Sequence, residues 1–322
     1  MTIVSKNAKC RSAILLACVL QYSASASEYL KAELRSTLVP EPAEYSVLLP
    51  DSYEETKSPF PLILLLHGGG SSHEELKLWQ TSFDKLWQRA EVAEAVVVMP
   101  NTESSLYMDF KDGSEKWQSF INGPFIKHVG ENFNVSTNRE HLVIGGTSMG
   151  GLGAFRFAFS NPGQFSGVAA LEPAIMPALH WEDVPQWNRF FLNDDLLEKG
   201  YGKPFDSHFW GKLQPAAIAT TNANQISASG LQIYLECGDE DYLNLHDGAE
   251  FLHGLLRENQ ILHEYHLIRG ANHLGRTLAG RREEAIRFLD RVLHPPGPDG
   301  SPDLKHMIEV LRDAKASAKR SP

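Results

Sequence analysis

Residues 141–153 read HLVIGGTSMGGLG, and this stretch decides the fold. An apolar run leads into GTSMG at 146–150, which has the form G-x-S-x-G, and a helical pattern follows at once. A strand, a tight turn and a helix in this order predict a turn that raises the Ser148 hydroxyl above the edge of a sheet, at the start of a helix. We therefore predict that Ser148 is a nucleophile. The alternative is a turn of small residues that contains a serine by chance.

A serine hydroxyl is a poor nucleophile unless a base takes its proton, so a histidine and an acid should follow along the chain. Two later apolar runs, 231–237 and 264–268, end in GDED and RGANH. Both loops are expected at the carboxyl edge of a parallel sheet, where such sheets build their sites. We predict His273 as the base and Asp241 as the acid. Asp239 is the alternative acid.

Acyl transfer also needs hydrogen-bond donors for the oxyanion that develops on the carbonyl. The second apolar run, 62–66, continues into His67 and three glycines, where the first donor loop of such a site belongs. The residue after the nucleophile supplies the second donor. We predict the backbone N–H groups of Gly69 and Met149 as the oxyanion hole. A merely flexible glycine turn is the alternative interpretation.

The rest of the chain alternates short apolar runs with longer amphipathic segments, which is typical of repeated βα units. The predicted strands are 45–49, 62–66, 95–99, 141–144, 167–171, 231–237 and 264–268. The predicted helices are 74–90, 115–133, 149–159, 245–258 and 280–293. The strands are continuously apolar, which indicates burial on both faces. We predict one α/β domain over 27–295, with a mainly parallel sheet and helices on both faces.

One segment, 173–230, breaks this alternation because it carries several tryptophans, phenylalanines and prolines and no clear strand. An insertion of this size is more often a lid or pocket wall than a second domain. Aromatic side chains from this segment and from earlier in the chain, together with Glu172, are candidate pocket residues, although aromatics also fill cores. These candidates are Tyr107, Phe110, Trp117, Glu172, Trp181 and Trp210.

The composition excludes several classes of function. The 40 acidic against 30 basic residues give a formal net charge of −10, which disfavours nucleic-acid binding. Three cysteines are too few for a disulfide framework. The glycines at 145–150 have phosphate-loop spacing, but Gly151 stands where lysine is required. The segments 263–266 and 239–244 fail the spacing of zinc and calcium sites. We therefore predict that no metal or cofactor is needed.

Both ends of the chain carry processing or linker signals. Residues 1–26 combine three basic residues, an apolar core at 13–20 and small residues before Ser27, as in a signal peptide. This predicts a secreted or periplasmic protein. The segment LLAC at 15–18 resembles a lipobox, so a lipid anchor at Cys18 is the alternative. The core is too short to span a bilayer. Residues 296–322 are predicted to form a linker and a short helix.

With these motifs placed, the chain resembles the esterase D and feruloyl esterase group of α/β-hydrolases, whose relatives include S-formylglutathione hydrolases, siderophore esterases and mycolyltransferases. The segments that carry the resemblance, within residues 44–290, are 62–70, 105–109, 117–125, 145–153, 201–210, 238–243 and 270–273. The resemblance implies an α/β-hydrolase fold and a triad at Ser148, Asp241 and His273. Glu172 departs from the group, which usually has a small residue there, so Glu172 is expected to line the pocket or to compete as the acid.

The sequence thus predicts a serine carboxylesterase that hydrolyses carboxylic esters through an acyl-enzyme. An acyltransferase with the same triad is the first alternative, because only the acceptor differs. A non-catalytic binding protein on the same scaffold is the second. Neither the acyl group nor the alcohol of the ester is specified by these residues.

Overall fold

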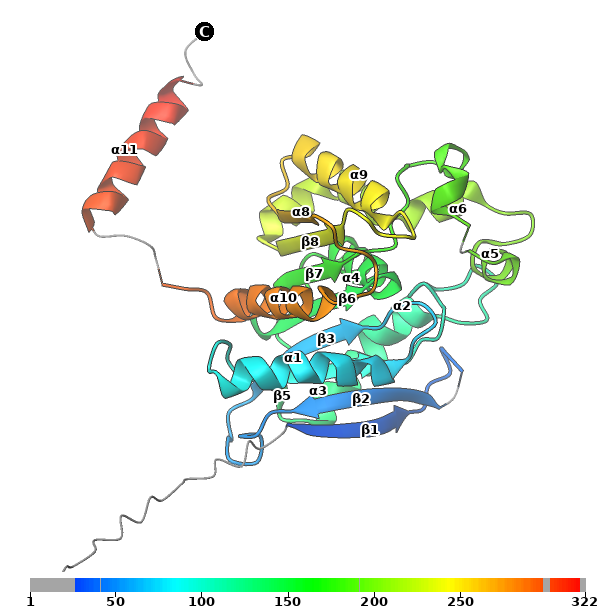
Figure 1. The fold of residues 1–322 in the computed structure, drawn as a ribbon, viewed down its shortest axis with the longest axis horizontal. Coiled ribbons are helices and arrows are strands. Elements are labelled where there is room, and N and C mark those ends of the chain that lie inside the picture. The colour runs from blue at the N-terminus through cyan, green and yellow to red at the C-terminus, as the bar shows by residue number, and fades with distance from the viewer. Residues whose placement is uncertain (1–26, 41, 191, 298–301, 319–322) are drawn as a thin grey trace, which may run out of the picture.

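The computed structural model describes residues 27–40, 42–190, 192–297 and 302–318. Nine strands form one sheet in the order β1-β2-β4-β3-β6-β7-β8-β9, and β5 pairs with β3 outside this path. The strands are β1 (Glu28–Leu34), β2 (Ala43–Leu49), β3 (Phe60–Leu66), β4 (Val96–Pro100), β5 (Val135–Ser136), β6 (Leu142–Thr147), β7 (Gly167–Leu171), β8 (Gln232–Gly238) and β9 (Glu264–Ile268). Figure 1 shows the sheet twisting through the middle of the molecule.

Most of the sheet is parallel. Strand β2 runs antiparallel to both β1 and β4, whereas β4, β3, β6, β7, β8 and β9 are parallel to one another. The central strands β4, β6 and β7 are buried at every position, because helices cover both faces of the sheet. The carboxyl ends of β3, β6, β7, β8 and β9 therefore meet at one edge, where the loops that follow them converge.

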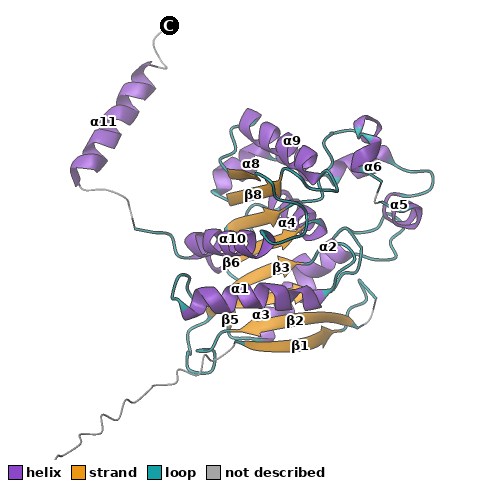
Figure 2. Cartoon of the chain, viewed as in Figure 1, coloured by secondary structure: helices purple, strands orange, loops and turns teal. Residues whose placement is uncertain are grey.

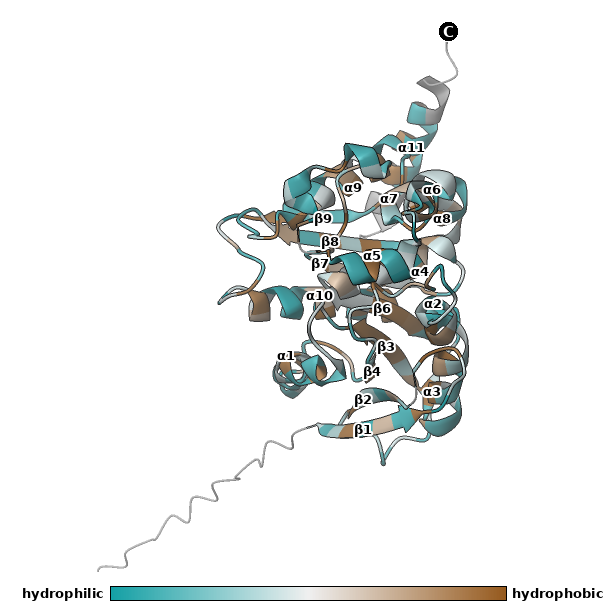
Figure 3. Ribbon diagram, turned by 90° about the vertical axis from the view of Figure 1, so that its right-hand side faces the viewer, coloured by the Kyte–Doolittle hydropathy of each residue, from teal (hydrophilic) through white to brown (hydrophobic). Residues whose placement is uncertain are grey.

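Helices pack on the two faces of the sheet, as Figures 1 and 2 show. They are α1 (Leu76–Gln88), α2 (Trp117–Phe120), α3 (Ile126–Asn132), α4 (Met149–Ser160), α5 (Asp194–Tyr201), α6 (Ser207–Lys212), α7 (Pro215–Thr221), α8 (Ala223–Ser229), α9 (Leu245–Glu258), α10 (Leu278–Leu293) and α11 (Pro302–Ala318). Helices α1 and α10 cover one face and bury Trp79, Phe83 and Leu289 against it. In Figure 3 these two helices lie on one side of β3 and β6, while α2, α3 and α4 lie on the other.

Helix α4 sits directly behind the predicted nucleophile, and every residue from Met149 to Phe159 is buried. Its sequence is apolar on nearly all sides, which is typical of a helix enclosed by other elements. The one charged residue, Arg156, donates hydrogen bonds to the backbone carbonyls of Leu213 and Leu106. These bonds link α4 to the insertion and to the loop after β4. They therefore fix the position of the helix that follows the turn at Ser148.

The insertion 173–230 lies between β7 and β8 and contains four helices, α5 to α8, with two short 3-10 turns. Helix α7 packs against α4 and α9, so the insertion shares the core of the main domain. Its aromatic residues largely pack on one another: Trp181 lies 4.7 Å from Phe205 and 5.4 Å from Trp210 between ring centroids. The start of the insertion at Ala174 and the segment around α5 line the cavity at the carboxyl edge of the sheet.

The predicted architecture agrees with the structure, with local differences. All seven predicted strands form, and 167–171 and 264–268 have the predicted bounds. Strand β1 was not predicted because its mixed polar sequence belongs to an exposed edge strand rather than to a buried one. The predicted helix 115–133 is interrupted at Ile121–Phe125 by a π turn that contains Pro124.

The chain termini are only partly described. The predicted signal segment 1–26 and the lipobox cysteine lie outside the described residues. In the predicted tail 296–322, helix α11 forms close to the expected position, and its described side chains are exposed. Among the described helices, none has the length and apolar character needed to cross a bilayer.

Candidate active site

Ser148 occupies a strained turn between β6 and α4. Its φ of 57° and ψ of −117° lie in a region that residues with a side chain rarely adopt, and such strain is often found at functional sites. The flanking glycines make the turn possible: a Cβ on Gly150 would lie 2.0 Å from the Leu66 carbonyl oxygen, and one on Gly146 would lie 2.6 Å from the carbonyl carbon of Gly150. The Ser148 N–H donates to the Leu171 carbonyl at 2.8 Å, which fixes the turn to β7.

His273 and Asp241 lie next to one another on the loops after β9 and β8. The distance from His273 Nδ1 to Asp241 Oδ2 is 2.8 Å, and both side chains are buried. The other carboxylate oxygen of Asp241 accepts the Leu243 N–H at 2.7 Å, which fixes its orientation. A carboxylate that accepts the Nδ1 proton leaves Nε2 of the ring free to act as a base.

The alternative acid, Asp239, does not contact the histidine side chain. Its Oδ1 accepts the Gly270 N–H at 2.6 Å and its Oδ2 lies 2.7 Å from Arg269 Nη1. Asp239 thus ties the β8 loop to the β9 loop, and Asn272 reinforces this link by accepting the Tyr242 N–H at 3.0 Å. The two acids therefore have different partners. Asp241 accepts a hydrogen bond from the imidazole of His273, whereas Asp239 accepts one from the backbone of the loop that carries His273.

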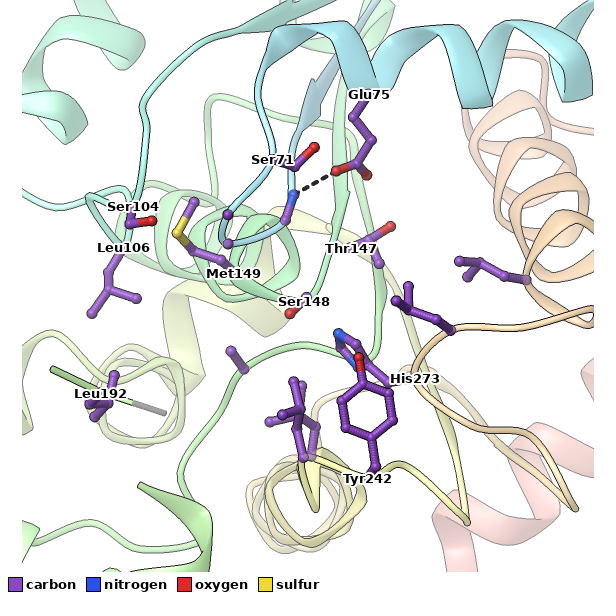
Figure 4. A pocket seen from close by; sticks show the side chains of 18 of the residues that line it. Ser71, Glu75, Ser104, Leu106, Thr147, Ser148, Met149, Leu192, Tyr242 and His273 are labelled. Atoms are coloured by element: carbon purple, nitrogen blue, oxygen red, sulfur yellow. Dashed lines mark hydrogen bonds between the residues drawn. The ribbon is translucent and has the colours of Figure 1, made fainter. Parts of the chain in front are cut away.

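Ser148 and His273 line the same cavity, which has a volume of about 480 Å³. Figure 4 shows the imidazole of His273 beside the Ser148 hydroxyl, with Tyr242 next to it at the cavity wall. The ring centroids of Tyr242 and His273 are 5.5 Å apart in an edge-to-face arrangement. The three predicted triad residues thus come together from β6, β8 and β9, although about 90 and 30 positions separate them along the chain.

The glycine loop after β3 lies against the start of α4. Gly69 lines the cavity, and a Cβ placed on it would lie 3.8 Å from the Cβ of Met149. Met149 is the first residue of α4, where the backbone N–H has no carbonyl of a preceding helical turn to bond. The Gly68 N–H is already used, because it donates to Glu75 Oε2 at 2.9 Å (dashed in Figure 4). The predicted donors Gly69 and Met149 are therefore adjacent at one end of the cavity.

Buried hydrogen bonds hold this glycine loop in shape. His67 Nε2 accepts the Thr102 N–H at 3.0 Å, so Nδ1 carries the proton and donates to the Gly68 carbonyl at 2.8 Å. Burial lowers the pKa of His67, which keeps the ring neutral in this tautomer. The Tyr107 hydroxyl donates to the His67 carbonyl at 3.0 Å. The loop is thus pre-organised by its own side chains and by its neighbours.

The cavity lining combines apolar and polar residues. Its apolar residues include Leu106, Ala174, Leu192, Leu196, Leu243 and Leu245. Its polar residues include Glu75, Thr147 and Arg282. Arg282 packs over Trp79, and its Nε has no hydrogen-bond partner among the described residues. The lining can therefore contact both the apolar groups and the polar atoms of an ester.

The aromatic residues proposed for the pocket lie in the core instead. Tyr107 is fully buried beneath the glycine loop, and Trp117 is buried with its Nε1 donating to Glu115 at 2.5 Å. Trp181 and Trp210 pack on each other inside the insertion. Phe110 is likewise in the core. None of them is among the residues that line the described cavity. Aromatic composition alone does not distinguish a core from a pocket wall.

Several cavity residues were missed by sequence reasoning. Tyr242 follows the acid directly, so its place beside the histidine could have been inferred from the loop. Glu75 and Arg282 lie near the starts of α1 and α10, and no motif marks them. Leu192 and Leu196 come from the insertion, whose path depends on packing between distant segments rather than on a local signal.

A buried ionic cluster lies behind the histidine. Glu172 and Glu236, both fully buried, share Arg281 of α10, with Nη2 on Glu172 and Nε 3.0 Å from Glu236. Burial raises the pKa of each carboxyl to about 7, because one guanidinium cannot compensate two buried carboxylates. Glu172 also lies 3.2 Å from His273 Nδ1, so it stands behind the imidazole rather than in the cavity wall.

Glu172, Asp241 and His273 each offer one possible metal-ligand atom, and these atoms lie within 4.8 Å of one another. The surroundings do not suit a cation. Asp241 accepts from the imidazole, and the second oxygen of Glu172 accepts from Arg281, whose positive charge would repel a metal ion. The donor set therefore fits an orienting hydrogen-bond network around Nδ1 better than a metal centre.

Comparisons with known proteins identify the family to which the chain belongs. The model of the Esterase family, described as "Putative esterase", matches residues 36–281. The chain is 26% identical to Esterase Rv1288 of Mycobacterium tuberculosis over 189 residues, which are 53% of this chain and 38% of that protein. It is 27% identical to an acetyl esterase of Caldicellulosiruptor saccharolyticus over 183 residues, 56% of this chain and 66% of that one. These matches span less than two thirds of either relative.

Solved structures share the fold. A ferulic acid esterase superposes with a TM-score of 0.67 at 20% identity, covering 83% of this chain and 98% of that one. FphF, a fluorophosphonate-binding serine hydrolase of Staphylococcus aureus, gives 0.66 at 20% identity over 84% of this chain and 100% of that one. The family match covers more than half of the sequence, and the chain therefore belongs to the Esterase family and has the α/β-hydrolase fold.

Proposed function

We propose that this protein is a serine carboxylesterase that works through Ser148, His273 and Asp241. The observation that carries the proposal is the 2.8 Å contact between His273 Nδ1 and Asp241, with the imidazole in the same cavity as a serine on a strained turn. Membership of the Esterase family supports the reaction class. The triad assignment itself rests on this geometry and on the order of the three residues.

In the proposed reaction, Nε2 of His273 takes the proton of the Ser148 hydroxyl as the oxygen attacks the ester carbonyl. Asp241 keeps the proton on Nδ1 and stabilises the imidazolium. The N–H groups of Gly69 and Met149 donate to the oxyanion, and each such donor typically lowers the barrier by about 3 kcal/mol. The imidazolium then protonates the departing alcohol. Water, activated by the same histidine, releases the acid and restores the serine.

The shape of the cavity supports a small to medium ester as substrate. Its volume of about 480 Å³ is at the lower end of typical ligand pockets, and much of its wall is apolar. Three apolar residues at its lining, Leu78, Tyr242 and Leu274, are more than half exposed. Water can therefore reach the acyl-enzyme, which supports hydrolysis over transfer to an acceptor alcohol.

The experiment that tests the proposal is hydrolysis of p-nitrophenyl acetate by the wild type and by Ser148→Ala. We expect the variant to lose at least about 10³-fold in kcat with an unchanged fold, because no acyl-enzyme can form. Ser160→Ala, a change at the far end of α4, is the control and should retain full turnover. Turnover of Ser148→Ala at the wild-type rate would refute the triad.

We also propose that the protein is exported, on the basis of the signal-like segment at 1–26. Cell fractionation with N-terminal sequencing tests this. A periplasmic or extracellular chain beginning near Ser27 is the expected result, and a lipid-modified Cys18 would support the alternative processing. An unprocessed chain in the cytosol would contradict export.

A further inference from the structure

Two carboxylates, rather than one, face the Nδ1 atom of His273. Asp241 Oδ2 is 2.8 Å away and Glu172 Oε2 is 3.2 Å away, and both side chains are fully buried. A triad requires one acceptor at this position. The second carboxylate therefore needs a separate explanation, since burying an ionisable group is costly.

Glu172 is held in place by its backbone as well as by its side chain. It follows β7, its φ is +48°, and its N–H donates to the Glu236 carbonyl at 2.7 Å. A left-handed conformation is uncommon for glutamate and is found most often where a site demands it. The carboxyl is thus directed at the histidine by a turn that the sequence does not favour by itself.

The two oxygens of the Glu172 carboxyl have different surroundings. Oε1 accepts a hydrogen bond from Arg281, which is itself tied to the histidine loop because its Nη1 donates to the Asn272 carbonyl at 3.1 Å. Oε2 is buried and makes no hydrogen bond of good geometry to the described residues. The nitrogen that faces Oε2 is Nδ1 of His273, at a distance of 3.2 Å. Arg281 therefore explains one oxygen and leaves the other facing the imidazole.

We propose that Glu172 is a positioning residue whose buried carboxylate, 3.2 Å from Nδ1 of His273, acts together with Asp241 to hold the imidazole in its reactive orientation. The inference rests on the proposed function, because it concerns the base of that same triad. In this arrangement either carboxylate alone fixes the tautomer, and both stabilise the imidazolium that forms during attack. The histidine is thus held from the β7 side as well as from the β8 loop.

The competing explanation is that Glu172 serves only as a partner for Arg281. Glu236 separates the two explanations, because it is equally buried and also binds Arg281, at 3.0 Å, but has no contact with the histidine. A glutamine at 236 removes a carboxylate from the same ionic cluster without touching the imidazole. The pair Glu172 and Glu236 is therefore a matched test and control within the molecule.

The test uses the full chain and four variants: Asp241→Ala, Glu172→Gln, Asp241→Ala/Glu172→Gln and Asp241→Ala/Glu236→Gln. Asp241→Ala removes the first acceptor without introducing an amide donor that would impose the wrong tautomer. We expect it to lose about 10- to 100-fold in kcat, because Glu172 still holds Nδ1. Adding Glu172→Gln should bring the total loss to about 10⁴-fold, the usual cost of a wrongly held imidazole. Adding Glu236→Gln should change kcat by less than about threefold.

The KM should stay within about threefold in all four variants, since none of the three carboxylates lines the cavity. Equal losses from Glu172→Gln and Glu236→Gln in the Asp241→Ala background would overturn the proposal, and so would a double variant no weaker than Asp241→Ala. Retained turnover by Ser148→Ala would instead refute the proposed function, so the two failures are distinguishable.

Two further readouts separate positioning from structure. The downfield Nδ1–H resonance of His273 should persist in Asp241→Ala and disappear in the double variant with Glu172→Gln. If that double variant does not fold, Glu172→Asp in the Asp241→Ala background takes its place: the shorter side chain keeps the charge but withdraws it from Nδ1. We expect that variant to lose at least about tenfold relative to Asp241→Ala, and unchanged turnover would overturn the proposal.

The pH profile adds a third readout. Burial raises the pKa of Glu172 and the Asp241 carboxylate adds to this rise, so in Asp241→Ala the Glu172 carboxyl should ionise at a lower pH. Turnover of Asp241→Ala should increase with pH as this carboxyl ionises, and that increase should be absent from Asp241→Ala/Glu172→Gln. The charged and titratable groups that face Glu172 are Arg281 and Arg282 on α10, Glu236 and Cys237 on β8, Asp241 after β8 and His273 after β9. Adding Glu236→Gln leaves this increase in turnover in place. A profile for Asp241→Ala with the same shape as that of Asp241→Ala/Glu172→Gln would overturn the proposal.

Discussion

At the scale of single residues, the site depends on how closely three segments of backbone approach one another. These segments are the end of β3, the end of β6 and the start of α4. The turn at Ser148 needs the helix start to lie directly on the end of β3, and Gly150 is the point of contact. This requirement explains why G-x-S-x-G was informative in the sequence: the glycines are needed for space, while the serine is needed for chemistry. The acid was less certain, since Asp239 and Asp241 both follow β8 and only the folded loop distinguishes them.

Gly150→Ala should therefore destabilise the protein and abolish turnover. The new Cβ would lie 2.0 Å from the Leu66 carbonyl oxygen, a backbone atom that cannot move without shifting β3. We expect a loss of about 2–4 kcal/mol in the free energy of unfolding, measured by urea denaturation. The control is Gly254→Ala in α9, which has open space around it and should gain up to about 1 kcal/mol from helix propensity. Equal stabilities of the two variants would contradict the packing argument.

At the scale of elements, the carboxyl ends of five strands bring the site together, and α10 braces it from behind. Strands buried on both faces were predictable because their apolar runs are continuous. The ionic cluster of Glu172, Glu236 and Arg281 was not predictable, since it joins β7, β8 and α10 through buried side chains. Only its first member stood out in the sequence, as a departure from the resembled group.

This cluster should make stability depend on pH. The pKa of Glu236 is raised from 4.5 to about 7 by burial, so between those values the folded protein holds a proton that the unfolded chain releases. Its contribution to the free energy of unfolding therefore falls as pH rises from about 4.5 to about 7. Glu236→Gln removes this contribution. The free energy of unfolding of the variant, relative to that of the wild type, should therefore increase by about 1–3 kcal/mol between pH 5 and pH 8. Urea denaturation at both pH values measures this, and parallel pH profiles would contradict it.

Helix α5 should limit the size of the acyl group. Leu196 lines the cavity, so Leu196→Ala creates room for about three methylene groups. We expect the ratio of kcat/KM for p-nitrophenyl octanoate over acetate to rise at least about threefold, because each buried methylene contributes about 0.8 kcal/mol. Leu262→Ala, an 89% exposed position outside the cavity, is the control. An unchanged ratio in Leu196→Ala would show that substrates do not reach α5.

At the scale of the whole molecule, the sequence predicts the fold class better than it predicts the pocket. The triad loops follow strands whose places in the sheet are set by connection rules, so their convergence follows from topology. The pocket walls come from the insertion, where Trp181 and Trp210 turn inward on each other and Leu192 and Leu196 face the cavity instead. Local sequence does not determine which side of such a segment faces the substrate, because packing against distant helices decides it.

The most direct test of the central claim is to map the residue that a fluorophosphonate probe modifies. The probe forms a stable adduct only with a serine whose hydroxyl is activated, so it reports the convergence of Ser148, His273 and Asp241 without knowledge of the substrate. Peptide mass mapping should find the adduct on Ser148 in the wild type, with labelling at least about 100-fold slower in His273→Ala. An adduct on another residue, or labelling of His273→Ala at the wild-type rate, would contradict the account.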